Sequence, residues 1–396
     1  MSSVVPATQD PSALLPPTVD ELRRVGLDAG LDVLGVTTAE ILEPARSVLT
    51  PRREAGLAGA MQFTYRNPER STDPGQILAG ARSMVVGLLA YPGHEPASSE
   101  GEGRVARYAT TDYYAQLRLA LAKVAEVLNV AGYATRIVAD SNALVDRNAA
   151  WRAGIGWYGK NTNLIHPTVG SWHVLGAVVT DAPLPGGDRP VEDGCGVCSV
   201  CIDQCPTEAL IGPGVLDGRR CIGWLVQAAE PIPMEFRVAV GDRIYGCDIC
   251  QEVCPPNRVA LRRRPLGGKS AGTGEDQNTD DGDASVDVWW LLDASDEQLL
   301  DRYGRWYLAN RDPDVLRRTA LVIVGNTADP GHPALRPLLG RYLSCERTLL
   351  VAHAIWAARR LGLDDLLAPF DPESDPHLGP DLRAELEASV EVRRRT

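Results

Sequence analysis

Two cysteine-rich stretches decide how this chain is organised. Residues 195–206 are CGVCSVCIDQCP and residues 247–255 are CDICQEVCP, and each stretch ends in a cysteine followed by proline. The first stretch has the spacing C-x2-C-x2-C-x3-C-P, and the second lacks only the first cysteine of that pattern. Cys221 lies between the two stretches and can supply the missing member. The chain therefore carries two sets of four cysteines.

Eight cysteines with this spacing are typical of bacterial ferredoxins that hold two [4Fe–4S] clusters. In that arrangement, three thiolates of one stretch bind one cluster and the cysteine before proline binds the other. The predicted ligands are Cys195, Cys198, Cys201 and Cys254 for one cluster, and Cys205, Cys221, Cys247 and Cys250 for the other. Zinc is the alternative, since four thiolates also suit tetrahedral Zn²⁺, but two Cys-Pro endings favour iron–sulfur clusters.

The remaining cysteine, Cys345, lies outside this pattern in the carboxyl-terminal part of the chain. A free cysteine behaves as a small hydrophobic residue, so we expect Cys345 to be a buried apolar side chain. The eight patterned cysteines alone predict electron-transfer chemistry.

Length and charge limit the classes of protein to consider. The chain has 396 residues, which suggests roughly two or three domains. Its 40 Lys and Arg against 52 Asp and Glu give a net charge of −12 (40 − 52), which argues against a broadly basic nucleic-acid binder. We see no export signal in residues 1–17 and no run of about 18 apolar residues. We therefore expect a cytoplasmic protein with reduced thiols and no membrane partner.

Upstream of the cysteines, the hydrophobic pattern alternates between helix and strand. It predicts a helix over 19–30, strands over 32–38 and 81–91, a helix over 113–132, and a strand over 134–140 that ends at Asp140. A helix through Arg152, a glycine-rich turn and strands near 163–166 and 172–181 follow. Strands separated by helices favour an α/β domain.

We expect four parts along the chain. These are an α/β domain over 17–185, a ferredoxin-like domain with two [4Fe–4S] clusters over 186–264, a flexible acidic linker over 265–287, and an all-α domain over 288–396. The last part contains predicted helices over 314–326 and 348–362, whose pairing resembles HEAT-type repeats.

The segment that starts at Asp140, DSNALVDRNAAWRAGIGWYGKNTNLI, closely resembles the epoxyqueuosine reductase family. The resemblance extends to NPERSTDPGQILAGARSMVVGLLAYP (67–92), GSWHVLGAVVTD (170–181), RIYGCDICQEVCP (243–255) and RRTALVIVGN (317–326). These enzymes are corrinoid-dependent iron–sulfur proteins that reduce epoxyqueuosine in the tRNA anticodon to queuosine, the last step of queuosine biosynthesis. The resemblance implies that the α/β domain binds cobalamin and that the nearby cluster passes electrons to cobalt.

Site residues follow from the same resemblance. Asp140 matches the family's catalytic proton donor, whereas the residues alone favour a cap of the next helix. The positions that match cobalamin contacts are Arg70, Asp140, Asn161, Thr162, Asn163, Val174, Gly223, Cys247 and Asp248. Arg317 and Arg318 match the basic start of the family's tRNA-binding helical tail.

The chain also departs from the family pattern at two positions. Tyr114 stands where histidine is common, and Ala106 stands where serine or cysteine is often found. Tyrosine can donate a hydrogen bond but cannot act as a histidine acid near neutral pH, so the proton path or the substrate can differ.

The expected partners are tRNA with epoxyqueuosine in its anticodon and an external low-potential electron donor, and we expect the chain to act as a monomer. Three other functions compete. The first is a corrinoid-dependent reductive dehalogenase-like reductase of a small molecule. The second is an electron carrier without catalysis, which leaves the α/β domain unexplained. The third is a zinc-stabilised RNA-binding protein.

Overall fold

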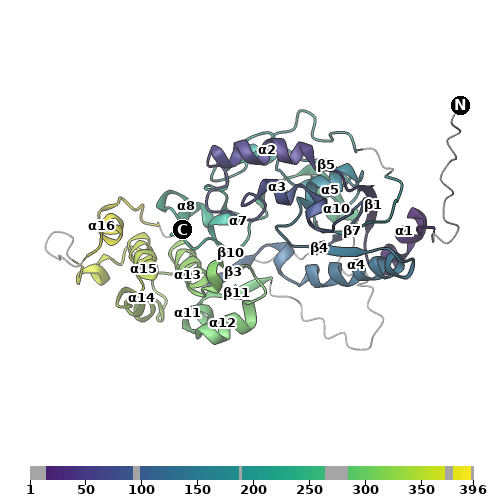
Figure 1. Cartoon of the computed structure of the whole chain (residues 1–396). Coiled ribbons are helices and arrows are strands. Elements are labelled where there is room, and N and C mark those ends of the chain that lie inside the picture. The colour runs from purple at the N-terminus through teal and green to yellow at the C-terminus, as the bar shows by residue number, and fades with distance from the viewer. Residues whose placement is uncertain (1–14, 92–98, 187–189, 264–283, 371–377, 394–396) are drawn as a thin grey trace, which may run out of the picture.

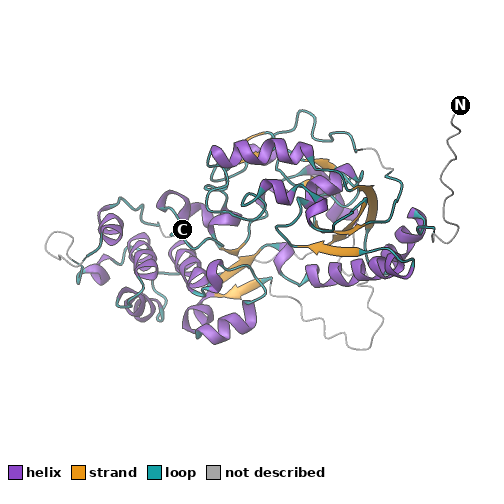
Figure 2. Cartoon of the chain, viewed as in Figure 1, coloured by secondary structure: helices purple, strands orange, loops and turns teal. Residues whose placement is uncertain are grey.

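The computed structural model describes residues 15–91, 99–186, 190–263, 284–370 and 378–393. A sheet-containing part with the amino-terminal half of the chain lies beside a helical part with the carboxyl-terminal third (Figures 1 and 2). Within these residues, every helix is too short or too polar to cross a bilayer.

A four-stranded sheet forms the centre of the first part. Its strands are β1 (Val33–Thr38), β2 (Ser83–Ala90), β4 (Thr135–Ala139) and β7 (His173–Thr180), in the order β1-β2-β7-β4. Every residue of β2 is buried, so both faces of the sheet are covered. Alternate side chains of β2 therefore enter two different cores, as the two-residue period of a strand requires.

One core lies between the sheet and helices α1 (Val19–Asp28) and α4 (Tyr113–Val130). The other lies under α2 (Glu43–Glu54) and α5 (Asp146–Arg152), near the short α3 (Pro68–Ser71) and η1 (Pro74–Gln76). Gly176 of β7 allows α4 to pack closely, because a Cβ there would stand 2.8 Å from a methyl of Leu121. Each buried Val or Leu of β2 contributes roughly 1.5–3 kcal/mol.

The mixed architecture of helices and strands is confirmed, but the α/β class is wrong in strand direction. All three neighbouring pairs of the sheet are antiparallel, whereas an α/β domain has a parallel sheet. Hydrophobic periodicity identifies strands and helices without specifying direction. The long connections between β1, β2 and β4 leave the chain free to return to either end of the sheet.

The helix α4 and the strand β4 bring Asp140 to the edge of the sheet. Asp112 caps α4 by accepting a hydrogen bond from the Ala115 backbone N–H at 2.8 Å. The chain reverses after α4 and β4 runs back along it, so that the Arg118 guanidinium donates to the Ala139 carbonyl at 3.3 Å. Asp140 therefore lies near the start of α4. In Figure 1, β4 points toward a small three-stranded sheet that contains residues 102–105.

The cysteine segment is built from short elements. They are α6 (Val200–Asp203), β8 (Leu210–Gly212), β9 (Val215–Leu216), α7 (Ile222–Leu225), α8 (Met234–Val240), β10 (Arg243–Tyr245), α9 (Ile249–Glu252) and α10 (Pro255–Arg263). Upstream of them, β5 (Trp157–Tyr158) pairs with β6 (Leu164–Ile165).

A second sheet joins three distant segments in the order β10-β3-β11, with β3 (Glu102–Val105) in the middle, followed by η2 (Arg107–Ala109). Its third strand is β11 (Ser285–Asp287), which corrects the end of the predicted linker. Val286 is buried in this strand, and its burial explains why the chain is ordered there. The remainder of that linker, 265–283, lies outside the described residues.

The carboxyl-terminal helices pack directly on the cysteine segment. They are α11 (Val288–Asp293), α12 (Asp296–Tyr303), η3 (Ala309–Arg311), α13 (Asp314–Thr327), α14 (Leu335–Leu343), α15 (Thr348–Arg360), η4 (Asp364–Leu367) and α16 (Pro380–Glu387). One hydrophobic cluster contains Val105, Ile222 and Ile244 together with Leu321 and Ile355. The helices around α13 and α15 thus share their core with the expected ferredoxin-like part.

Candidate functional site

The thiols predicted to bind the first cluster lie close together. Burial raises the pKa of Cys254 to about 11, and the charges of Cys195, Cys201 and Cys198 raise it as well. Burial and the same neighbours, Cys195 and Cys198, raise the pKa of Cys201. The local turn is closed by the Cys198 N–H, which donates to the Cys195 carbonyl at 3.0 Å.

The second predicted set is also brought together. Burial raises the pKa of Cys250 well above its ordinary value, and the charges of Cys247, Cys221 and Cys205 act in the same direction. Burial raises the pKa of Cys247 to about 12. Within the described residues, no three Cys, His, Asp or Glu side chains converge on one point as the ligands of a single metal ion do.

Cys345 is only half-buried, at the edge of the helical core, so its predicted full burial is wrong. It follows the end of α14, and Arg341 and Arg347 near it in the chain form ion pairs with Asp293 and Asp312. Cys345 couples to none of the patterned thiols whose pKa values shift.

Asp140 lies at the carboxyl end of β4 in an unusual backbone conformation. Its φ is +51°, a left-handed value that costs free energy for a residue other than glycine and often marks a functional site. Its side chain reaches solvent, but desolvation by the surrounding protein raises its pKa, while Arg118 lowers the pKa and Asp112 raises it. The helix-cap alternative is wrong, because α5 begins at Asp146 and its N-cap is Val145.

Aromatic side chains connect Asp140 to the second cysteine group. The Asp140 charge raises the pKa of both Tyr114 and Tyr245, although desolvation is the larger cause for each. Tyr245 is two residues from Cys247 in the sequence, and its ring lies 6.2 Å from that of Tyr108. Tyr245 is thus affected by the Asp140 charge and lies close to Cys247 in the chain.

Polar and titratable side chains gather around Tyr158 near the start of α5, and we call Tyr158, Arg147, Asn148 and His173 the Tyr158 cluster. Tyr158 is 38% exposed, and desolvation raises its pKa to about 12. The Arg147 charge lowers the pKa of Tyr158 and of Tyr114. It also lowers the pKa of the Cys221 thiol, although burial, the larger cause, raises that pKa.

Two buried polar atoms of this cluster have no hydrogen-bond partner among the described residues. They are Asn148 Oδ1 and His173 Nδ1. Asn148 bonds to Tyr158 through its side chain, and desolvation lowers the pKa of His173 to about 3, so that its imidazole is neutral. Buried polar groups normally find partners, so these two atoms suit a polar ligand.

The predicted cobalamin contacts fall into two groups near the thiols. Asn161 is buried and donates from its amide to the Cys250 carbonyl at 3.2 Å, while its Oδ1 accepts from the Asn163 N–H at 3.2 Å. Thr162 between them has a φ of +67°. A Cβ built on Gly223 would lie 3.7 Å from Cys221 Sγ and 3.8 Å from the Cys247 nitrogen, so Gly223 is directly beside the second thiol group.

The remaining predicted contacts, Asp248, Arg70 and Val174, differ in their burial. Asp248 is buried, accepts from the Arg107 backbone N–H at 2.7 Å, and has a pKa raised to about 6, chiefly by burial. Arg70 is exposed and lies within the short helix α3. The Val174 side chain packs in the core under α1 and α4, so only its backbone faces other partners.

The prediction that Arg318 binds RNA is wrong. Its side chain is fully buried, and the guanidinium donates to the carbonyls of Leu225 and Ala228 at 2.8 Å each. Burial lowers the pKa of Arg318 to about 9. Arg318 therefore joins α13 to the segment after α7.

Arg317 is similarly engaged within the protein, which contradicts its prediction as an RNA contact. Its side chain is 11% exposed and forms ion pairs with Asp296 at 2.6 Å and Asp314 at 2.8 Å. The sequence showed two adjacent arginines but not their acidic and carbonyl partners, which come from other parts of the chain.

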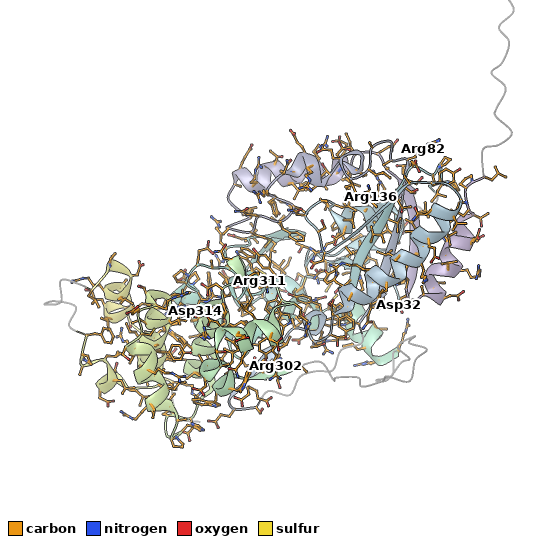
Figure 3. All side chains as sticks on the ribbon, turned by 60° about the horizontal axis from the view of Figure 1, so that its bottom comes forward. Asp32, Arg82, Arg136, Arg302, Arg311 and Asp314 are labelled. Carbon is orange, nitrogen blue, oxygen red and sulfur yellow. The ribbon has the colours of Figure 1, made fainter. Side chains whose placement is uncertain are left out.

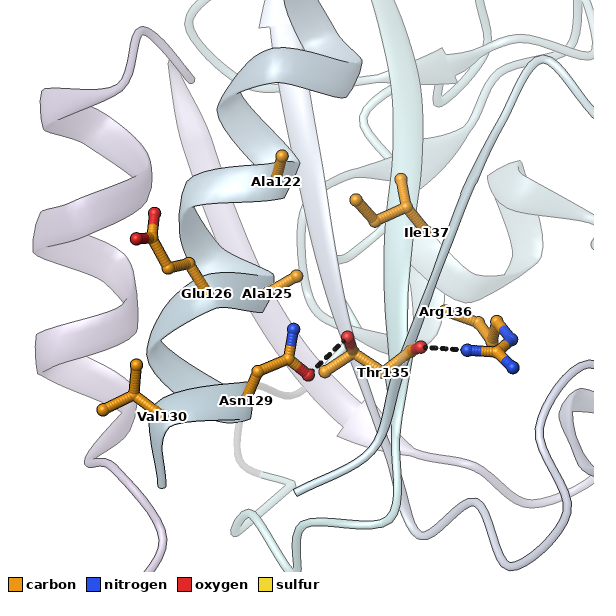
Figure 4. A pocket seen from close by; sticks show the side chains of 8 residues that line it. All are labelled: Ala122, Ala125, Glu126, Asn129, Val130, Thr135, Arg136 and Ile137. Atoms are coloured by element: carbon orange, nitrogen blue, oxygen red, sulfur yellow. Dashed lines mark hydrogen bonds between the residues drawn. The ribbon is translucent and has the colours of Figure 1, made fainter. Parts of the chain in front are cut away.

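Sequence reasoning missed Arg147, Tyr158 and Tyr245 as site residues. Each lies inside a stretch that carries the family resemblance, and each is distinguished only by its long-range neighbours. An open groove of about 550 Å³ between α4 and β4 is a separate feature (Figure 4). It is lined by Asn129, Thr135 and Ile137 and lies at the opposite end of β4 from Asp140.

Comparisons with known proteins agree with this geometry. Residues 194–257 match the family model described as a 4Fe-4S double cluster binding domain. An epoxyqueuosine reductase of Bacillus anthracis is 33% identical over 343 residues, which cover 85% of this chain and 87% of that protein. An epoxyqueuosine reductase of Vibrio cholerae is 31% identical over 353 residues, covering 85% and 90%.

Solved structures give the same result. A crystal structure of an epoxyqueuosine reductase with an epoxyqueuosine-modified stem loop of tRNA-Tyr has a TM-score of 0.80 and 30% identity, over 93% of this chain and 96% of that chain. The Bacillus subtilis enzyme, with its catalytic aspartate loop swung out of the active site, has a TM-score of 0.80 and 28% identity over the same shares.

Proposed function

The chain belongs to the epoxyqueuosine reductase family, and we propose that it reduces epoxyqueuosine in a tRNA anticodon to queuosine. The observation that carries the proposal is the left-handed backbone of Asp140 at the end of β4, together with the effect of its charge on Tyr245, two residues before Cys247. A proton donor beside an electron-transfer centre is what reductive removal of an epoxide oxygen requires. The reaction consumes two electrons and two protons and releases the oxygen as water.

We propose that the two thiol groups hold two [4Fe–4S] clusters. The ligands of one are Cys195, Cys198, Cys201 and Cys254, and those of the other are Cys205, Cys221, Cys247 and Cys250. The cysteine before each proline couples to the thiols of the other stretch, in line with the exchange between clusters in bacterial ferredoxins. The four parts predicted along the chain remain our proposal for its domain layout, except that the linker ends before β11.

The residues of the Tyr158 cluster fit cobalamin. Asn148 Oδ1 and His173 Nδ1, unpartnered among the described residues, can accept hydrogen bonds from amide N–H groups at the corrin periphery, and the exposed Arg70 can reach the same ligand from α3. We also assign to cobalamin the remaining predicted contacts, Asp140, Asn161, Thr162, Asn163, Gly223, Cys247, Asp248 and the Val174 backbone. When bound, cobalamin supplies a redox-active cobalt ion, and the protein positions it.

Asp140 provides the proton in this proposal. Desolvation raises its pKa, so a larger fraction of the carboxyl group is protonated near neutral pH than for an aspartate in water. Tyr114 has a pKa raised above that of free tyrosine and is a poor acid, so it can orient the substrate by a hydrogen bond without giving up its proton. An external low-potential donor supplies the electrons, and the enzyme acts as a monomer in the cytoplasm, where tRNA is modified.

The test uses the chain purified without oxygen, supplied with cobalamin and a chemical reductant. The substrate is an anticodon stem–loop that contains epoxyqueuosine, and the nucleosides are then analysed by mass spectrometry. We expect queuosine, lighter by one oxygen atom, only when both cobalamin and reductant are present. An unchanged stem–loop together with reduction of an aryl halide would contradict the proposal and support the dehalogenase-like alternative.

A further inference from the structure

An exposed aromatic side chain stands beside the site and has no role in the function described so far. Tyr307 is 56% exposed, in the loop between α12 and η3. Its ring stacks on that of Trp224, with centroids 6.2 Å apart and planes at 28°. Trp224 lies in α7, next to Gly223 and three residues after Cys221. The Tyr307 ring, which packs on α7 beside the second thiol group, is therefore open to solvent.

The backbone of Tyr307 is held in place by the site itself. Its N–H donates to the Tyr245 hydroxyl at 2.8 Å, and that hydroxyl also lies 3.3 Å from the Tyr307 carbonyl. The Tyr245 ring stacks on Trp306 with centroids 4.5 Å apart, and Trp306 stacks on Tyr303 at the same distance. The Asp140 charge also raises the pKa of Tyr245. Tyr307 and Asp140 therefore share Tyr245 as a rigid aromatic neighbour.

The surroundings of Tyr307 are basic and conformationally strained. Arg305 and Arg311 are exposed on either side of it in sequence, and Arg305 donates to the Thr110 carbonyl at 3.0 Å. Asn310 and Arg311 have φ values of +57° and +55°, left-handed conformations that are costly for such residues and concentrate at functional sites. Figure 3 shows Arg311 on the side of the helical part that faces the sheet-containing part.

From these contacts we propose that Tyr307, supported by Trp224, is a stacking surface for one unpaired base of the substrate RNA, with Arg305 and Arg311 placed for the adjacent phosphates. Proteins that bind single-stranded RNA combine aromatic side chains, on which bases stack, with basic residues along the backbone. A chain with net charge −12 cannot rely on a broad positive surface, so a local contact of this kind is needed. The inference rests on the proposed function, because it takes the RNA substrate from it.

The test compares three proteins by the binding of an anticodon stem–loop in which one loop nucleotide at a time is abasic. They are the wild-type chain, Tyr307→Ala, and Tyr307→Phe as a matched control that keeps the ring. Tyr307→Ala should weaken binding of the intact stem–loop by about 5- to 150-fold, the usual effect of removing one stacking partner, whereas Tyr307→Phe should bind like the wild type.

Two further readouts separate stacking from a structural effect. At one loop position, the abasic change should weaken binding to the wild-type chain but have no further effect on Tyr307→Ala. The slope of log affinity against log salt concentration should be unchanged in Tyr307→Ala. In Arg311→Gln the slope should fall by about one, since only this change removes a phosphate contact. Iron content and visible spectrum should match the wild type in all variants.

Two outcomes would overturn the inference. If the wild-type chain binds and reduces the stem–loop while Tyr307→Ala binds it within twofold, the stacking surface is refuted and the proposed function stands. If the wild-type chain binds no stem–loop, both fail.

Discussion

At the scale of single residues, the role proposed for Asp140 distinguishes an enzyme from an electron carrier. Its left-handed φ is costly for a residue other than glycine, and desolvation raises its pKa. The charged and titratable groups that couple to it come from α4 and its cap, from α5 and from β10: Arg118, Asp112, Tyr114, Asp146 and Tyr245.

Replacing Asp140 by asparagine tests its role as proton donor. Asn keeps the shape of the side chain and tolerates the left-handed backbone, but it cannot deliver a proton. We expect iron and cobalamin content to be retained while conversion of epoxyqueuosine falls by about 10²–10⁴-fold in single-turnover measurements. Activity within a few-fold of the wild type would refute the catalytic role, and loss of cobalamin together with activity would make Asp140 a cofactor contact.

Arg118 should set the pH range in which Asp140 works. Its guanidinium lowers the Asp140 pKa and donates to the Ala139 carbonyl at 3.3 Å. A proton donor is active below its pKa, so activity should fall as pH rises through the Asp140 pKa. Arg118→Gln removes the positive charge and raises that pKa, so the fall should move to higher pH, whereas Arg118→Lys should leave it nearly in place. An unshifted pH–rate profile in Arg118→Gln would show that Arg118 affects only the conformation of the chain at the end of β4, through its hydrogen bond to Ala139, and not the Asp140 pKa.

At the scale of elements, the cysteine segment works as a framework of short helices and turns. Each stretch presents its first thiols from a turn and sends the cysteine before proline toward the other group. The half-buried Cys345 belongs to the region after α14 and couples to neither group.

Serine substitutions distinguish these cysteines. An anaerobic preparation of the wild-type chain should contain about eight irons, four in each cluster. Cys250→Ser removes a ligand of the second group, so the iron content should fall toward about four, with bleaching of part of the visible absorbance. Cys345→Ser is the matched control and should leave the iron content unchanged. Stoichiometric zinc in place of iron would contradict the assignment of [4Fe–4S] clusters to both thiol groups.

Arg318 illustrates how α13 is attached to the cysteine segment. Its guanidinium satisfies the carbonyls of Leu225, Ala228 and Glu230 in the chain that follows α7. Arg318→Met should keep the packing volume but leave these buried acceptors unpaired, which costs on the order of 3 kcal/mol of unfolding free energy. Urea denaturation measures this loss. Arg336→Met, which removes an exposed ion pair with Asp365, is the control and should leave the denaturation midpoint nearly unchanged.

At the scale of the whole molecule, a single hydrophobic cluster joins the helical part to the strands and helices that flank the cysteines. The buried pair between Arg237 of α8 and Glu385 of α16, with 2.8 Å between Nη1 and Oε2, adds a polar link across the same boundary. The helices that would carry RNA and the segment that would carry the clusters therefore form one packed unit.

This shared core predicts cooperative unfolding. Leu321 of α13 is fully buried in the cluster, and Leu321→Ala should cost about 2–5 kcal/mol through lost contacts and a residual cavity. Cluster absorbance and helical circular dichroism should then be lost in one transition, shifted equally for both signals. Two separate transitions, with only the helical one shifted, would show that the helical part folds independently.

The sequence by itself determined the features that depend on local spacing. The cysteine pattern predicted which thiols come together, the hydrophobic periodicity predicted β1, β2, α4 and β4, and the strand ending placed Asp140. Each of these depends on residues close together in the chain, where the periods of helix and strand and the reach of a cysteine loop are set by covalent geometry.

Only the tertiary structure decided the features that depend on distant partners. The sheet is antiparallel because the long connections return each strand to the opposite end, and Arg318 is buried because carbonyls some ninety residues away accept its protons. Tyr307 meets Trp224 and Tyr245 across similarly long separations. A side chain's burial and charge partners are set by the packing of the whole chain, so one-dimensional spacing cannot tell a buried arginine from a phosphate ligand, or a core tyrosine from an exposed stacking surface.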